Sequence, residues 1–250
     1  MYEGDKMVTY LKLARKYASD LGVEFREFTA DELRNFEEVY NRMFILHYQE
    51  RELIELFQKR KADILAGAMV AAAQFEKRFG GEIPGTGEFG MTYIRAAYLG
   101  IGDDWEDAAP FTTGSPQYWI HSGTTLLGGT SGNPIKIGEN LVLVIIGIGS
   151  LHPSPKIESF YFELDGNPKP IVVTGFPFKL SEIPIKELSR SIILYEDRQV
   201  LAKVFISAKY GSSVDDYPYL LGAAFLPEDM LKKHDPADVV KSVNKIVLTT

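Results

Sequence analysis

Hydrophobic positions follow two different periods along this 250-residue chain. In residues 6–79 they recur every three or four positions, which is typical of amphipathic helices. From residue 116 onward they form short runs separated by turn residues roughly every 8 to 12 positions, which is typical of an antiparallel β-sandwich. The pattern predicts an α+β protein with a helical arm at 1–80, a glycine-rich hinge and acidic loop at 81–115, and a β-sandwich domain at 116–250.

The helical half contains one clear start signal and one ambiguous break. Met7 to Leu21 predicts a short amphipathic helix that ends at Gly22. Thr29 and Glu32 have the spacing of a capping box, in which each side chain bonds the other residue's backbone amide. The apolar stripe then continues to Leu65, so the sequence allows either one long helix or two helices with a break near 47–52.

A run of small apolar residues, ILAGAMVAAA at Ile64–Ala73, closes the helical half. Small side chains let a helix approach its neighbour closely. Three alternatives remain open for this run: a buried helix in its own domain, a contact between subunits, or contact with a membrane. The candidate subunit-interface residues are Ile64, Gly67, Ala68 and Ala71.

The β half predicts strands with distinct environments. Asn140–Gly149 is apolar on both faces, which indicates a central strand covered on each side. Asp165-Gly166 separates two alternating runs and predicts a hairpin turn. Pro218 restricts its segment to a strand start or an edge. Further strands are expected near 117–121, 124–128, 133–137, 156–165, 168–175, 189–195, 198–209, 217–226 and 243–249, with a brief helical piece at Met91–Leu99.

Composition narrows the classes of function. The net charge of −7 argues against a generic nucleic-acid binder, which needs Lys and Arg to neutralise phosphates. The compact basic run Lys59, Arg60 and Lys61 is expected to be a solvated helix face, or a contact to packaged nucleic acid if the arm faces inward. The absence of cysteine excludes disulfides, thiolate zinc sites and a cysteine nucleophile. No segment has the length and hydropathy of a membrane span or a signal peptide.

Each candidate for chemistry also has a structural explanation. Gly85, Gly87 and Gly90 match GxGxxG, but a predicted helix precedes them where a dinucleotide site needs a strand. The acidic cluster Asp103–Asp107 lacks the spacing of a calcium loop and is expected to be solvated. The candidate metal-binding and nucleophilic groups are single histidines without metal-site spacing and serines in turns: His47, His121, His152, His234, Ser131, Ser212 and Ser213. We therefore expect no enzymatic activity, cofactor or metal, although carboxylates gathered from separate strands stay possible.

The order of parts resembles a known family. The helical arm, the hinge and the strands from GTTLLGGTSGNPIKIGENLVLVIIGI through KIESFYFELDGNPKPIVV to YLLGAAFLPED are similar in layout to coat proteins of tailless icosahedral viruses of the archaeal type. The resemblance implies a single jelly roll whose subunits form a closed shell in a virion. It also implies as partners copies of the same chain, other virion proteins and packaged nucleic acid.

A different class of function stays open. A β-sandwich with a helical stalk could be an oligomeric carbohydrate- or surface-binding protein, in the cytoplasm for example. This alternative predicts small oligomers and an exposed aromatic platform, for which Tyr118, Trp119 and Tyr210 are the candidates.

Overall fold

A computed structural model describes residues 3–47, 51–78, 88–102, 104–122, 133–152, 154–167, 171–174, 184–227 and 244–247. The described helices are α1 (Glu3–Leu21), α2 (Ala30–His47) and α3 (Arg51–Arg78), with 3-10 turns at Ala96–Leu99, Trp105–Ala108 and Ala208–Tyr210. The strands are β1 (Glu88–Tyr93), β2 (Phe111–Thr112), β3 (Gln117–Ile120), β4 (Ile135–Lys136), β5 (Val142–Ser150), β6 (Ile157–Leu164), β7 (Ile171–Thr174), β8 (Ile185–Leu194), β9 (Gln199–Ile206), β10 (Ser213–Val214), β11 (Pro218–Pro227) and β12 (Asn244–Val247).

The predicted α+β architecture is confirmed. Sheet A has the strand order β12-β1-β11-β5-β8. Sheet C has the order β3-β9-β6-β7, with β4 also paired to β9. Strands β2 and β10 form a separate two-stranded sheet B. The pairs β1·β11, β3·β9, β5·β8 and β6·β7 are nested along the chain and all antiparallel. Such nested pairs, folded into two facing sheets, form the jelly-roll topology. Strand β12 extends sheet A beyond β1.

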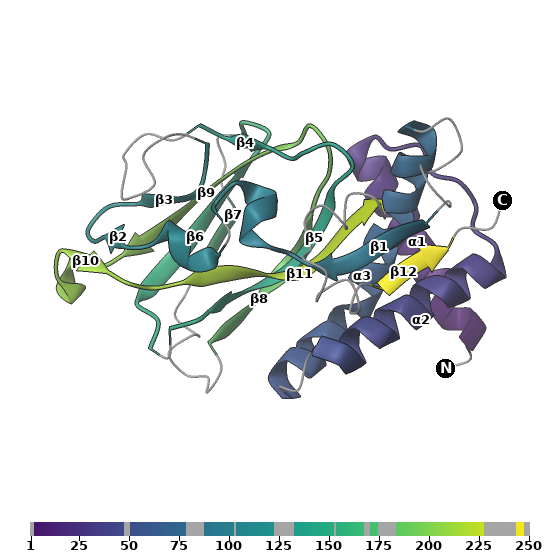
Figure 1. The fold of residues 1–250 in the computed structure, drawn as a ribbon, viewed down its shortest axis with the longest axis horizontal. Coiled ribbons are helices and arrows are strands. Elements are labelled where there is room, and N and C mark those ends of the chain that lie inside the picture. The colour runs from purple at the N-terminus through teal and green to yellow at the C-terminus, as the bar shows by residue number, and fades with distance from the viewer. Residues whose placement is uncertain are drawn as a thin grey trace.

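The protein has three layers rather than two. Figure 1 shows the helices on one side of the molecule and the strands of sheet C on the other, with sheet A between them. One apolar core lies between the helices and sheet A, and the second lies between the two sheets. On β5, Val142, Val144 and Ile146 join the helix-side core. The other face of the strand joins the inter-sheet core, which explains why β5 is apolar on both faces.

The close fit of α3 depends on its small residues. A Cβ atom on Gly67 would lie 2.2 Å from Val144 Cγ2, so only glycine permits this approach without a shift. Ile64, Ala68 and Ala71 are fully buried. The small-residue run is therefore buried within the chain, against the sandwich strands β5 and β11.

The capping box and the break after α2 are both present. The Thr29 amide donates to Glu32 Oε2 at 2.7 Å, and the Glu32 amide donates to Thr29 Oγ1 at 3.2 Å. Helix α2 ends at His47 and α3 begins at Arg51, so the apolar stripe forms two helices.

Several predicted strands need adjustment. The helical piece expected at Met91–Leu99 is wrong, because Met91 belongs to β1 and only Ala96–Leu99 forms a 3-10 turn. Phe89 and Met91 alternate toward the helices with period two, a pattern that the neighbouring glycines obscured. The strand expected at 124–128 lies outside the described residues. The Asp165-Gly166 hairpin is confirmed, with φ of 51° and 68° at these residues, and β11 begins at Pro218.

The buried acid Glu32 is joined through Arg26, in the loop before α2, to helix α3. Glu32 is 1% exposed and accepts two hydrogen bonds from Arg26, at 2.6 and 3.1 Å. Arg26 also donates to Glu76 Oε1 of α3 at 2.6 Å. Burial alone would raise the pKa of Glu32, but the hydrogen bonds from Arg26 and Thr29 outweigh it and lower that pKa below 4.5.

The Glu32→Gln variant tests this link. Because the folded-state pKa is lowered, the carboxylate stabilises the protein above pH 4.5, and this contribution is lost as the pH falls through the folded pKa. We expect Glu32→Gln to lower the free energy of unfolding by roughly 2 kcal/mol at pH 7, with the difference shrinking in acid. Urea denaturation across a pH series measures it. Glu38→Gln, at an exposed pair, should change little, and equal losses in both variants would contradict the assignment.

Candidate functional site

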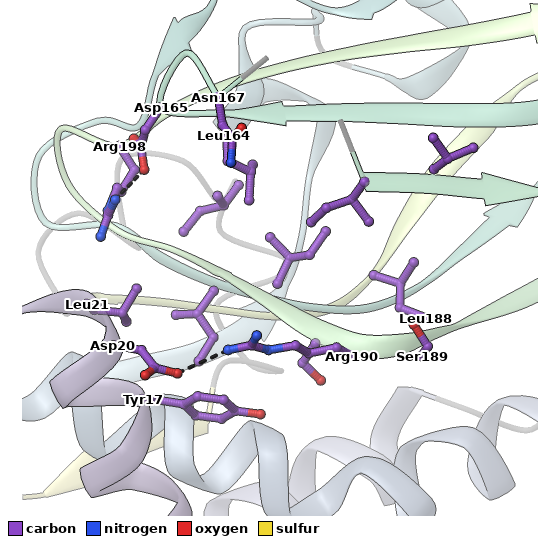
Figure 2. Close-up of a pocket in the computed structure, with 16 residues that line it drawn as sticks. Tyr17, Asp20, Leu21, Leu164, Asp165, Asn167, Leu188, Ser189, Arg190 and Arg198 are labelled. Carbon is purple, nitrogen blue, oxygen red and sulfur yellow. Dashed lines mark hydrogen bonds and ion pairs between the residues drawn. The ribbon is translucent and has the colours of Figure 1, made fainter. Parts of the chain in front are cut away.

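One cavity in the described part of the fold lies where the sandwich is not closed. In the described part of the chain, strands β7 and β8 are the edge strands of sheets C and A, and they do not pair with each other. Between them and α1 lies a cavity of about 630 Å³, which we call the mouth cavity (Figure 2). Its volume falls within the range of about 300 to 1,000 Å³ that is usual for ligand pockets.

The wall of the mouth cavity is largely apolar. Ile171 stands opposite Phe162 in the β6·β7 register, and Phe162 is buried in the inter-sheet core. Ile171 therefore occupies an inward-facing position, yet it is 43% exposed. The described residues therefore leave the inter-sheet core uncovered at this end. The other apolar residues of the wall are Leu21, Leu164, Val172, Leu188, Ile192, Ile193 and Leu194.

A bulge in β8 places a cation at the rim. Gly147 pairs with Glu187 and Ile145 pairs with Ile192, so residues 188–191 face a single residue of β5. A bulge of this kind leaves residues unpaired and changes the direction of their side chains. Arg190 lies in the bulge, and its Nη2 donates to Asp20 Oδ2 of α1 at 3.0 Å.

A second ion pair lines another part of the wall. Arg198 pairs with Asp165 of the β6–β7 turn, and Asp165 Oδ1 also accepts from the Gln199 amide at 3.0 Å. Burial alone would lower the pKa of Arg198, but the hydrogen bond to Asp165 raises it, so the cation persists. Figure 2 shows this pair beside Leu164 and the Asp20–Arg190 pair near Tyr17.

A network of charges supports the helix side of the cavity. Tyr17 donates to Asp63, and Arg60 pairs with Asp63 at 3.0 Å and with Glu187 at 2.8 Å. Arg60 also donates to the Leu188 carbonyl in the β8 bulge. Burial and the hydrogen bond to Asp63 raise the pKa of Tyr17, which keeps its hydroxyl protonated. The network connects α1, α3 and β8 around the bulge.

The predicted basic run is part of this intramolecular network. Lys59 pairs with Glu187 at 2.6 Å, and Arg60 pairs with the same carboxylate. Lys61 turns toward α2, where it pairs with Glu37 and donates to Asn41 at 3.2 Å. All three cations are therefore paired within the chain.

The four candidate interface residues lie together, but inside the molecule. Ile64, Gly67, Ala68 and Ala71 are buried beneath sheet A. In this fold the face that was expected to contact a second subunit is covered by the chain's own strands β5 and β11.

The three residues expected to form an exposed aromatic platform lie in different environments. Trp119 is 2% exposed and packs against Trp105, Phe160 and Phe162, so its assignment to an exposed platform is wrong. Tyr118 lies on the outer face of sheet C, with Lys203 Nζ 4.9 Å from its ring centre. Tyr210 lies in a 3-10 turn beside Lys209.

Among the described residues, the remaining candidates do not come together in one site. Asp104 and Asp107 cap the 3-10 turn that begins at Trp105, and Asp103 lies outside the described part. Gly85 and Gly87 also lie outside it, whereas Gly90 belongs to β1. In the described residues no group of His, Asp and Glu is placed to hold a metal ion.

The mouth cavity was not predicted from the sequence. Its lining comes from α1, β6, β7, β8 and the turn before β9, which are far apart along the chain. Of these residues, only the Asp165-Gly166 turn had a recognisable sequence pattern, and that pattern predicted the hairpin but not the cavity.

Comparisons with known proteins add no relative. No protein-family model, curated protein or solved structure matches the chain. Among the described helices, none combines the length and hydropathy needed to cross a membrane. The strand order and the helices define the class of the protein: an α+β protein with a jelly-roll sandwich and a helical layer.

Gly67→Leu tests the contact of α3 with sheet A. Leucine would overlap Val144, and overpacking of a core typically costs about 1 to 3 kcal/mol. We expect a loss of this size in the free energy of unfolding, measured by urea denaturation. Gln58→Leu, at an exposed position of the same helix, is the matched control. Equal stability of the two variants would contradict the close approach.

Proposed function

We propose that the protein is a self-assembling structural protein, a capsid subunit that contacts copies of itself in the shell of a virion. The observation that carries this proposal is the edge strand β7. Its outer edge has no strand partner among the described residues, and Ile171 and Val172 are 43% and 53% exposed. An exposed apolar edge strand can serve as a template for pairing with another chain.

The outer face of sheet C extends this surface. Tyr118 pairs with Lys203, Lys203 with Tyr161, and Tyr161 with Val172, which places the four side chains in one row across the sheet. Tyr118, Tyr161 and Lys203 are partly exposed. Tyrosine is enriched in protein interfaces because its ring is apolar and its hydroxyl can bond. Sheet A, in contrast, is covered by helices, so the proposed contacts fall on sheet C.

The topology supports this proposal without deciding it. Jelly rolls occur in viral coat proteins, lectins and cupins, and a fold alone does not define a function. Contact with packaged nucleic acid has weaker support, since Lys59, Arg60 and Lys61 are paired with acidic or amide groups of the chain. The proposal therefore rests on contacts between copies.

The edge variant Val172→Lys tests the proposal. Burial of a valine contributes about 1.5 kcal/mol or more, and tenfold in an equilibrium constant corresponds to about 1.4 kcal/mol. We expect the concentration needed for assembly to rise at least about tenfold, measured by light scattering and negative-stain microscopy. Val8→Lys is the matched control, because Val8 is 50% exposed but lies on α1.

Three outcomes would overturn the proposal. A monodisperse wild-type monomer over a range of salt and protein concentration would exclude self-assembly. An equal effect of Val8→Lys would exclude β7 as the contact. Small oligomers that bind glycans through Tyr118 and Tyr161 would favour the alternative of a carbohydrate-binding sandwich.

A further inference from the structure

We propose that the mouth cavity binds a single-chain amphiphile with a carboxylate head group, its alkyl chain between the two sheets and its head group on Arg190. This inference does not depend on assembly. The amphiphile could be a fatty acid of medium chain length.

The apolar part of the cavity fits an alkyl chain. Leu188, Ile192 and Leu194 of β8 belong to the inter-sheet core, and they also line the cavity. Ile171 faces the same layer but is 43% exposed, so this inward-facing apolar position is not fully covered. An alkyl chain in this space would remove the exposed surface of Ile171 and its own methylene groups from water, and each buried methylene group would strengthen binding by up to about fourfold.

The polar part of the cavity fits a carboxylate. In the described part of the chain, the Arg190 guanidinium donates one hydrogen bond, from Nη2 to Asp20. Its guanidinium has five N–H donors, so donors remain for a second carboxylate. The Arg190 side chain is 72% exposed at the rim, where a head group can reach it from solvent.

A neighbouring hydroxyl provides an independent indication. Ser191 also lines the cavity and is 6% exposed, and its hydroxyl has no hydrogen-bond partner among the described residues. A buried hydroxyl without a partner is unfavourable. A carboxylate on Arg190 would offer this hydroxyl an acceptor when a small shift of the bulge opens it to the cavity.

Arg198 is a weaker candidate for the head group. Its guanidinium carbon lies 4.9 Å from the ring centre of Tyr195, and the side chain pairs with Asp165. Its side chain is 30% exposed, compared with 72% for Arg190. The assignment therefore names Arg190.

Calorimetric titration of the full chain tests this inference. Octanoate, decanoate and dodecanoate, each below its micelle-forming concentration, are expected to bind with affinity that rises with chain length. Decanoate should bind roughly tenfold more tightly than decanol, because only the carboxylate forms charge-assisted hydrogen bonds with Arg190. No saturable binding of any of these carboxylates would overturn the proposal.

Two pairs of variants locate the site. Ile171→Glu should abolish decanoate binding by placing a like charge in the cavity, whereas Leu151→Glu, at another exposed leucine, should not. Arg190→Gln should remove the preference for decanoate over decanol, whereas Arg42→Gln, on α2, should retain it. Unchanged binding by Ile171→Glu would exclude the mouth cavity, and an unchanged preference in Arg190→Gln would exclude the head-group assignment. Circular dichroism of each variant separates these results from misfolding.

Discussion

The contact of α3 with sheet A is the constraint on which the rest of the structure depends. Gly67 lets the helix backbone approach Val144, and the alanines around it fill the space without larger side chains. Without this layer, the apolar face that β5 presents to the helices would be in water. The helices therefore form a second core with sheet A and hold this sheet in place.

Charged residues of α3 also hold β8, the edge strand of sheet A. Arg60 and Lys59 hold Glu187, and Arg60 also binds the carbonyl at the start of the β8 bulge. Helix α3 thus holds strand β8 in place. No described helix packs as closely on β7, which belongs to the opposite sheet. The two edges do not meet, and the mouth cavity lies between them.

Buried acids show how this fold satisfies its polar groups. Asp216 is fully buried, and it accepts from Ser150 at 2.6 Å and from the amides of Lys156 and Ile157 at 2.7 and 3.2 Å. It fixes the turn between β5 and β6 as Glu32 fixes the start of α2. Each of these buried carboxylates is satisfied by several donors of the chain and so stabilises the local structure around it.

The sequence by itself determined the helical half, the capping box at Thr29, the double-faced strand β5 and the Asp165-Gly166 hairpin, because each depends on local periodicity or turn chemistry. Only the tertiary structure decided that Met91 lies in a strand, that Trp119 is buried and that Lys59, Arg60 and Lys61 have partners within the chain. It also decided the position of the mouth cavity. Strand pairing and ion pairing join residues far apart along the chain, such as Arg190 with Asp20, and periodicity carries no signal for such contacts.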